Sequence, residues 1–182
     1  MTYIIEYQKK FTDLKSHLDN KVQLLLQANG GNSILFSYPP EEEKLYIEKA
    51  KEIYADKALF IDVSKLLVQF IDEDGWESFK DYYRDFRSTP HLIFRSEDPA
   101  IDLFDLIIEK INEAYQIDKI PFLIRSGCLY GTGIENANIM ENKVVMNQSV
   151  PLVIFYPSKI EDDNIYFLNF KLASKYRCIL VR

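Results

Sequence analysis

The spacing of apolar residues along the chain predicts helices and strands in alternation. An apolar residue at every third or fourth position marks an amphipathic helix, whereas a short continuous apolar run marks a buried strand. The continuous runs predict strands at residues 34–38, 58–63, 120–124, 152–156, 165–168 and 176–181. The helical spacing predicts a helical segment over residues 1–31, closed by the turn signal Asn29-Gly30-Gly31, and helices over 40–54 and about 134–143.

Three further helical patterns lie between residues 64 and 115. Ser64 can cap the first, whose buried face would be Leu66, Leu67, Phe70 and Ile71. After a stop at Asp74-Gly75, an aromatic stripe follows at helical spacing: Trp76, Phe79, Tyr83 and Phe86. We assign this stripe to core packing, with a partner-binding face as the alternative. Residues 88–98 are expected to form a loop, and Asp98-Pro99 to open the helix with the clearest apolar face: Ile101, Phe104, Ile108, Ile111 and Tyr115.

The alternation of strands and helices predicts a single α/β domain over residues 1–182. It would have three layers around a mostly parallel central sheet, with the layering of P-loop and Rossmann folds but without a nucleotide motif. The runs at 120–124 and 152–156 are apolar throughout, as expected for strands that helices cover on both faces. Residues 164–182 would add basic C-terminal strands near the edge of the sheet.

Composition limits the class of protein. Hydrophobic residues make up 47% of the 182 residues and aromatic residues 14%, which is enough to build a folded core. No apolar run reaches the length of a membrane span, and the first ten residues lack the features of a signal peptide. The two cysteines, Cys128 and Cys178, form neither a disulfide framework nor a CxxC pair. We therefore expect a cytoplasmic protein without membrane association.

The charge of the chain is uneven. The net charge is −6, but residues 164–182 contain four basic residues and no acidic one, so the remainder carries −10. An acidic body repels the backbone of nucleic acids, and we expect no direct nucleic-acid binding. The basic end is typical of an edge strand whose lysines face water, and contact with an acidic partner is the alternative.

Sequence motifs for catalysis, nucleotide binding or metal binding do not occur in the chain. The two histidines, His17 and His91, lie in unrelated contexts and are too few for a histidine metal site or a catalytic triad. The acidic run Glu161-Asp162-Asp163 is typical of a solvated turn between two strands. We therefore expect no enzyme activity, no metal and no cofactor.

The first strand-to-helix turn is unsuited to phosphate. A phosphate at a helix N-terminus needs free backbone N–H groups. Pro39-Pro40 removes two of these donors, and residues 41–43 add three glutamates that occupy the positive end of the helix dipole. The pattern starts a helix well, and the carboxylates could also form a lip that contacts a partner.

The most informative residues lie at the strand ends, because ligands and partners gather at the carboxyl ends of parallel strands. Two strands end in Tyr38-Pro39 and Tyr156-Pro157, and a third runs into residues 125–133, RSGCLYGTG. Parallel neighbours would bring together Tyr38, Arg125, Cys128, Tyr130 and Tyr156. The prolines are expected to stop the strands, and Gly127, Gly131 and Gly133 to let the third loop pass close to another backbone.

Four interpretations of this edge stay open. The Tyr-Pro corners can be packing devices, or the tyrosines and Arg125 can form a protein-contact surface, since both residue types are enriched at binding hot spots. A degenerate nucleotide or phosphate site would use the loop from Gly127 to Gly133, with Arg125 as its cation. A thiol enzyme at Cys128 would need a base or cation nearby, and only Arg125 is close in sequence.

Several segments together resemble the BrxB family of bacteriophage-exclusion (BREX) defence systems. Three of them carry most of the match: FSYPPEEE at residues 36–43, PLVIFYPSK at 151–159 and KYRCILV at 175–181. The segment FLIRSGCLYG at 122–131, followed by IMENKV at 139–144, fits the family's strand, small-residue loop and short helix. The combination, in this order, covers most of the chain from residue 33 onward.

The resemblance implies a small, non-catalytic cytoplasmic component of a phage-defence complex. Its partners would be the system's alkaline-phosphatase-like protein (PglZ) and, as a second candidate, the large BREX ATPase. In such an adaptor we expect the partner to bind at Tyr38, Arg125, Tyr130, Tyr156, Tyr176 and Arg177.

Overall fold

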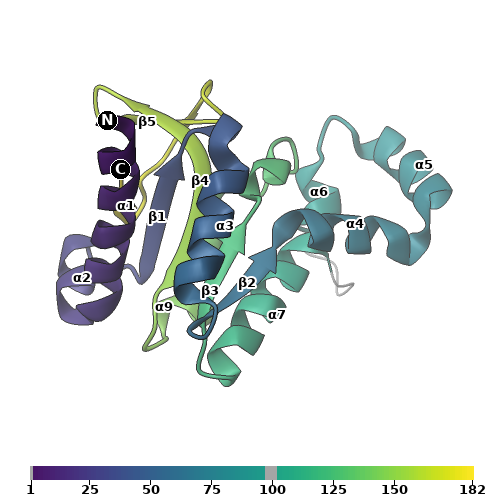
Figure 1. The fold of residues 1–182 in the computed structure, drawn as a ribbon. Helices are drawn as coiled ribbons and strands as arrows, with labels where there is room; N and C mark the ends of the chain where they lie inside the picture. Colours follow the sequence, from purple (N-terminus) through teal and green to yellow (C-terminus); the bar gives the residue numbers. More distant parts are fainter. Residues whose placement is uncertain (1, 97–101) are drawn as a thin grey trace.

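The computed structural model describes residues 2–96 and 102–182, and it has the predicted three-layer α/β architecture (Figure 1). The parallel part of the sheet has the strand order β2-β3-β4-β1-β7. These strands are β1 (Ser33–Tyr38), β2 (Ala58–Asp62), β3 (Ile120–Ile124), β4 (Leu152–Glu161) and β7 (Ile179–Val181). The far end of β4 continues into an antiparallel ribbon with β5 (Asn164–Phe167) and β6 (Lys171–Ala173).

Helices cover both faces of the sheet. One face packs against α1 (Thr2–Asp19), α2 (Lys21–Gln27) and α3 (Glu43–Tyr54). The other packs against α4 (Val63–Asp74), α6 (His91–Phe94), α7 (Leu103–Gln116), α8 (Asn136–Met140) and α9 (Lys143–Met146). Because side chains alternate along a strand, β1 serves both cores: Phe36 faces the first helical layer and Leu35 the second.

The central strands were predicted well, and the later elements less well. The prediction that proline stops the strand at Pro157 is wrong, because β4 runs through Pro157 to Glu161 and changes partners on the way. The prediction missed β6 and began β7 three residues too early. The predicted helix over 134–143 is two short helices, α8 and α9, and the predicted loop at 88–98 contains α6.

Two helix starts also differ from the prediction. Ser64 does not cap α4, which begins at Val63; the Ser64 hydroxyl donates to Asp62 Oδ1 at 2.6 Å instead. The predicted opening at Asp98-Pro99 lies outside the described residues. Within them, α7 begins after Asp102, whose Oδ1 accepts the backbone N–H of Asp105 at 2.8 Å, as an N-cap residue does.

The acidic run at residues 161–163 forms the turn between β4 and β5, as predicted. Asp162 and Asp163 both have positive φ, 48° and 65°, a conformation that Asp adopts more readily than most residues. All three side chains are exposed, and Asp163 pairs with Arg182 at 2.9 Å.

A helical arm leaves the sheet at its β2 edge. It consists of α4 and α5 (Trp76–Phe86), which Figure 1 shows running away from the sheet, with α5 at the far end. Among the described elements, α5 has its main contacts with α4 and α6 rather than with the sheet. In α5, none of the eleven residues is buried.

Candidate functional site

The carboxyl ends of the parallel strands form one candidate site. The turns after β1, β2, β3 and the bend in β4 meet around an open depression of about 290 Å³. Its lining residues are Pro40, Glu43, Ser64, Arg125, Gly127, Cys128, Pro157 and Leu168. The predicted convergence of strand ends is therefore present for Arg125, Cys128 and the two Tyr-Pro corners.

An ion pair dominates the chemistry of this depression. Arg125 Nη1 lies 2.6 Å from Asp62 Oδ2, and Ser64 donates to the other oxygen of the same carboxylate. Burial raises the pKa of Asp62, but the hydrogen bond from Ser64 and the charge of Arg125 outweigh it, so the pKa is below its ordinary value. Arg125 is thus engaged by a carboxylate, and Glu43 adds a second acid to the lining. Because two carboxylates face a single guanidinium, the charge of the depression disfavours an anionic ligand.

Arg125 has a left-handed backbone, with φ 59° and ψ 36°. A residue other than glycine pays for this conformation, and the neighbouring contacts hold it in place. The hydroxyl of the next residue, Ser126, donates to the Phe155 carbonyl at 2.7 Å and ties the loop to β4. The turn directs Arg125 across the strand ends toward Asp62.

Tyr38 and Tyr156 do not lie on the surface, which corrects their prediction as direct partner contacts. Tyr38 is fully buried against the first helical layer, and its hydroxyl donates to Glu43 Oε2 at 2.8 Å. Burial and the Glu43 carboxylate raise its pKa well above the ordinary range. Tyr156 is buried on the opposite face of the sheet, where its ring stacks on Phe167 at 4.6 Å.

The other predicted contact residues do not form one surface. Tyr130 is exposed and meets Phe170 edge to face at 5.3 Å, near the β5–β6 ribbon. Tyr176 and Arg177 precede β7 and so lie at the amino end of the parallel strands. The guanidinium of Arg177 lies 5.5 Å from the centre of the Tyr176 ring. The predicted set is therefore divided between opposite ends of the sheet.

The geometry of Cys128 opposes a role as a nucleophile. Its side chain is partly buried, and burial, together with the nearby Asp62 carboxylate, raises the pKa of its thiol from 9.0 to about 11. Burial and the Asp62 carboxylate therefore both disfavour the thiolate. Cys178 is buried in the second core, and burial raises its pKa to about 11 as well.

We expect Cys128 to react slowly with iodoacetamide at neutral pH. A thiol pKa two units above 9.0 lowers the thiolate fraction roughly 100-fold relative to an ordinary cysteine peptide. Its alkylation rate should keep rising up to about pH 11 and level off above it. Mass spectrometry of the peptide that contains Cys128 measures this rate, and a plateau near the ordinary thiol pKa of about 8.5 would contradict the prediction.

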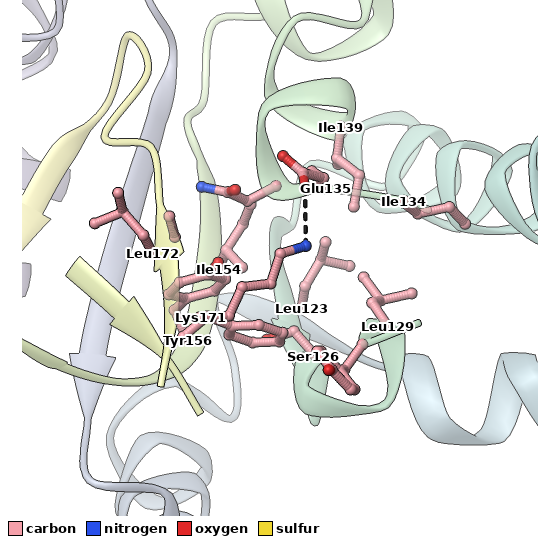
Figure 2. Close-up of a pocket in the computed structure, with 14 residues that line it drawn as sticks. Leu123, Ser126, Leu129, Ile134, Glu135, Ile139, Ile154, Tyr156, Lys171 and Leu172 are labelled. Atoms are coloured by element: carbon pink, nitrogen blue, oxygen red, sulfur yellow. Dashed lines mark hydrogen bonds and ion pairs between the residues drawn. The ribbon is translucent and has the colours of Figure 1, made fainter. Parts of the chain in front are cut away.

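The glycine-containing loop after β3 lies between a small enclosed pocket and a wider, open depression of about 480 Å³, which Tyr130, Gly131 and Gly133 help to line. Figure 2 shows the pocket between this loop and β6, with Ile154 and Tyr156 on the sheet side and Ile134 and Ile139 opposite. Lys171 and Glu135 form an ion pair of 2.9 Å near its opening. The enclosed space is about 30 Å³, enough for a water molecule, whereas ligand sites are typically roughly 300 Å³ or more.

Gly133 shows why this loop needs glycine. It has φ +80°, and a Cβ there would lie 2.6 Å from the Cβ of His91 and 3.0 Å from its Cα. The loop thus packs directly on the backbone of α6, which confirms the predicted close approach. Gly133 therefore serves the packing of this loop on α6.

Among residues 2–96 and 102–182, no group of three His, Cys, Asp or Glu side chains is placed to hold a metal ion. A search of the same residues finds no helix with the length and hydropathy of a membrane span.

The aromatic helix α5 is the second candidate site, and its assignment to the core holds only for Phe79 and Phe86, which are partly buried. Each of its eleven residues is described, and none is buried. Trp76 is 58% exposed, Tyr82 47% and Tyr83 38%, while Phe79 and Phe86 pack against the edge of the second core. Helical spacing correctly groups the stripe on one face, but α4 and α6 cover only part of it.

A chain of aromatic contacts joins this surface to the interior. The ring of the buried Phe94 lies 6.0 Å from Phe79, which in turn stacks on Trp76 at 6.4 Å and on Tyr83 at 6.0 Å. Phe70 of α4 meets both Phe79 and Phe94. The exposed rings are therefore held by packed neighbours, which reduces the side-chain entropy they would lose on binding a partner.

One sequence signal could have identified this surface. Tyr82 lies three residues after Phe79 and four before Phe86, so it widens the stripe of Trp76, Phe79, Tyr83 and Phe86 on the same face of the helix. A face this rich in tryptophan and tyrosine has the composition of a protein interface as well as that of a core.

Comparison of the chain with known protein families, curated proteins and solved structures gives no match. The function is therefore inferred from the residues and their geometry.

Proposed function

We propose that this chain is a non-catalytic adaptor that binds a partner protein in a BREX-type anti-phage defence complex. The observation that carries the proposal is the aromatic surface of α5, where Trp76, Tyr82 and Tyr83 are exposed on a packed support. Tryptophan and tyrosine are among the residues that contribute most at protein interfaces, and monomeric surfaces seldom group them without a partner.

The assignment to a BREX-type system rests on the resemblance to the BrxB family. The three segments that carry the resemblance contribute β1, β4 and β7, which are neighbours in the sheet. They supply three adjacent strands of the parallel sheet, and the arm lies outside them. In this proposal the chain acts in the cytoplasm, and its partners are the alkaline-phosphatase-like PglZ protein and the large BREX ATPase.

The electrostatics of the strand ends favour this proposal over a degenerate nucleotide or phosphate site. Arg125 is paired with Asp62, and Glu43 adds negative charge beside it. The depression of about 480 Å³ beside Gly131 and Gly133 has Lys171 in its lining, and this lysine is already paired with Glu135. A phosphate would have to displace a carboxylate from Arg125 and be desolvated beside another.

Affinity purification from the native host tests the proposal. The tagged protein should copurify with an alkaline-phosphatase-like protein or a large ATPase, identified by mass spectrometry, and the tag alone should not. Genes for these partners should lie beside the gene for this chain. Recovery of the protein alone at both low and moderate salt, from cells that express the neighbouring genes, would contradict the adaptor role.

A further inference from the structure

The tip of the arm carries negative side chains at the C-terminal end of α4, where the dipole of the helix makes them unfavourable. Asp72, Glu73 and Asp74 form the last turn of α4, all three are exposed, and that turn contains no basic residue. The C-terminal end of a helix carries a partial negative charge, so acidic side chains there are unfavourable for α4. A cation bound at this end would relieve the repulsion.

The surrounding arm has the same sign of charge. Residues 72–85 contain six acidic and two basic residues, a net charge of −4. Both basic side chains already have partners on α5: Lys80 pairs with Glu77, and Arg84 lies 3.1 Å from Asp81. The charge that remains for an external partner therefore comes from the last turn of α4 and from Asp85.

Trp76 lies next to this charge. It follows Asp74-Gly75 directly, it is 58% exposed, and its ring continues through Phe79 to Tyr83. Tryptophan offers the most favourable ring for a cation–π contact, and arginine is its most frequent partner. An exposed aromatic row beside exposed carboxylates is complementary to a segment that carries both apolar and cationic side chains.

We propose that the arm tip, formed by the last turn of α4 and the exposed rings of Trp76 and Tyr83, docks a basic amphipathic segment of a partner protein. Apolar side chains of that segment lie on the aromatic row, and its arginine or lysine side chains meet Trp76 and the carboxylates of residues 72–74. This inference rests on the proposed adaptor function and names the surface and the chemistry of the partner. The negative charge of the tip disfavours nucleic acid and anionic membranes as occupants.

The charge around Trp76 can be measured without a partner, because Trp76 is the only tryptophan in the chain. The ratio of its quenching constants for caesium and iodide should exceed the ratio for a neutral tryptophan amide at the same low ionic strength, because partial burial lowers both constants alike. Neutralising the tip with Asp72→Asn, Glu73→Gln and Asp74→Asn should shift this ratio toward the reference. Equal ratios for wild type and the neutral reference would contradict a negative surface at this ring.

Binding is tested with two labelled peptides. One has leucine at its apolar helical positions and arginine at its polar positions, and the other has glutamate in place of every arginine. Fluorescence anisotropy should show saturable binding of the basic peptide alone. We expect Trp76→Ala to weaken it roughly 30-fold, a hot-spot effect, and the triple variant of residues 72–74 to weaken it about tenfold or more. Rising salt should weaken the wild-type complex more than the triple-variant complex.

A matched control carries the same change of charge elsewhere. Glu161→Gln, Asp162→Asn and Asp163→Asn neutralise the exposed turn between β4 and β5, and the peptide should bind this variant as it binds wild type. Circular dichroism confirms that each variant is folded. Equal loss of binding in both triple variants, equal binding of both peptides, or preferential binding of the protein to neutral phosphatidylcholine vesicles would each overturn the docking proposal.

The purification from the host separates this inference from the proposed function. If defence proteins copurify with wild type and equally with the arm variants, the adaptor role stands and the docking surface is wrong. If the basic peptide binds as described but no defence protein copurifies, the surface stands and its assignment to a defence complex is wrong.

Discussion

Replacing Gly31 with alanine is expected to lower the free energy of unfolding by about 3 kcal/mol or more. A Cβ on Gly31 would lie 1.8 Å from the carbonyl oxygen of Arg177, 2.7 Å from its carbonyl carbon and 2.9 Å from its Cβ. Two of these atoms are backbone, so no side-chain rotation can make room. Either β1 or the segment that enters β7 must move, and the pairing of Ile34 with Ile179 would be lost.

The neighbouring Gly30 provides the control. Its φ is +80°, and nothing lies within 4 Å of a Cβ placed there, so Gly30→Ala should cost only about 1 kcal/mol, for the left-handed backbone. Urea unfolding followed by circular dichroism compares the two variants. Similar midpoints for Gly31→Ala and Gly30→Ala would show that the contact with Arg177 is not rigid. Faster proteolysis near the C-terminus of Gly31→Ala would identify β7 as the element that is displaced.

This contact also explains the position of one predicted partner-binding residue. Arg177 has a left-handed backbone, φ 41°, and its main chain lies against Gly31 at the amino end of β1. Its neighbours in the sequence suggested a basic contact surface. In the structure, however, the backbone at this position also passes close to the backbone at Gly31. The two segments lie far apart in the sequence, and no local pattern indicates that they meet.

The strands were predictable because their signal is local. β1, β2 and β3 are short apolar runs that end at Tyr38-Pro39, Asp62 and Arg125, and the structure places their ends within a residue of the prediction. β4 differs because Pro157 lies where the strand leaves its parallel neighbours and begins to pair with β5. A proline interrupts one ladder there without ending the strand, and only the tertiary arrangement of β5 reveals this.

The burial of the two Tyr-Pro tyrosines follows from register, which the sequence leaves open. Ser37 pairs with Tyr156 and Tyr38 pairs with Pro157. Side chains of paired residues in neighbouring strands point to the same face, and successive residues alternate. Tyr38 and Tyr156 are therefore one step out of phase and face opposite helical layers. Two identical dipeptides at strand ends gave the impression of one shared edge, although their tyrosines lie on opposite sides of the sheet.

The exposure of the aromatic face of α5 could not be predicted from the sequence either. The period of Trp76, Phe79, Tyr83 and Phe86 correctly predicts a helix with a continuous aromatic face. Whether another element covers that face depends on where α4 leads the chain, and α4 leads away from the sheet (Figure 1). Helical periodicity defines a face and cannot supply its partner. The candidate surface was thus visible in the sequence, but its exposure was not.

Asn32→Asp is expected to destabilise the protein by about 4 kcal/mol or more at neutral pH. The Asn32 side chain is fully buried, and its Nδ2 lies within hydrogen-bond distance of three backbone carbonyls: those of Val145 at 3.0 Å, Gln148 at 3.1 Å and Val150 at 3.0 Å. Its two hydrogens are shared among these three acceptors. These bonds fasten the start of β1 to the segment that leads into β4. A carboxylate cannot donate to carbonyls, so the variant places a buried negative charge against three oxygen atoms.

The destabilisation by Asn32→Asp is expected to increase with pH. Burial beside carbonyl oxygens favours the neutral acid, so the pKa of the introduced carboxyl group in the folded variant lies above the unfolded value of about 3.9. Below about pH 3.9 the carboxyl group is protonated in both the folded and the unfolded state, and the loss of stability is smallest. The loss grows as the pH rises and levels off above the pKa of the folded state. Urea unfolding of the variant, measured as a difference from wild type at each pH, tests this. The same change at the exposed and nearby Asn29, Asn29→Asp, places the charge just beyond the C-terminal end of α2 and should cost no more than about 1 kcal/mol at any pH. A loss for Asn32→Asp that does not vary with pH would show that the charge plays no part and that the missing donors account for all of it.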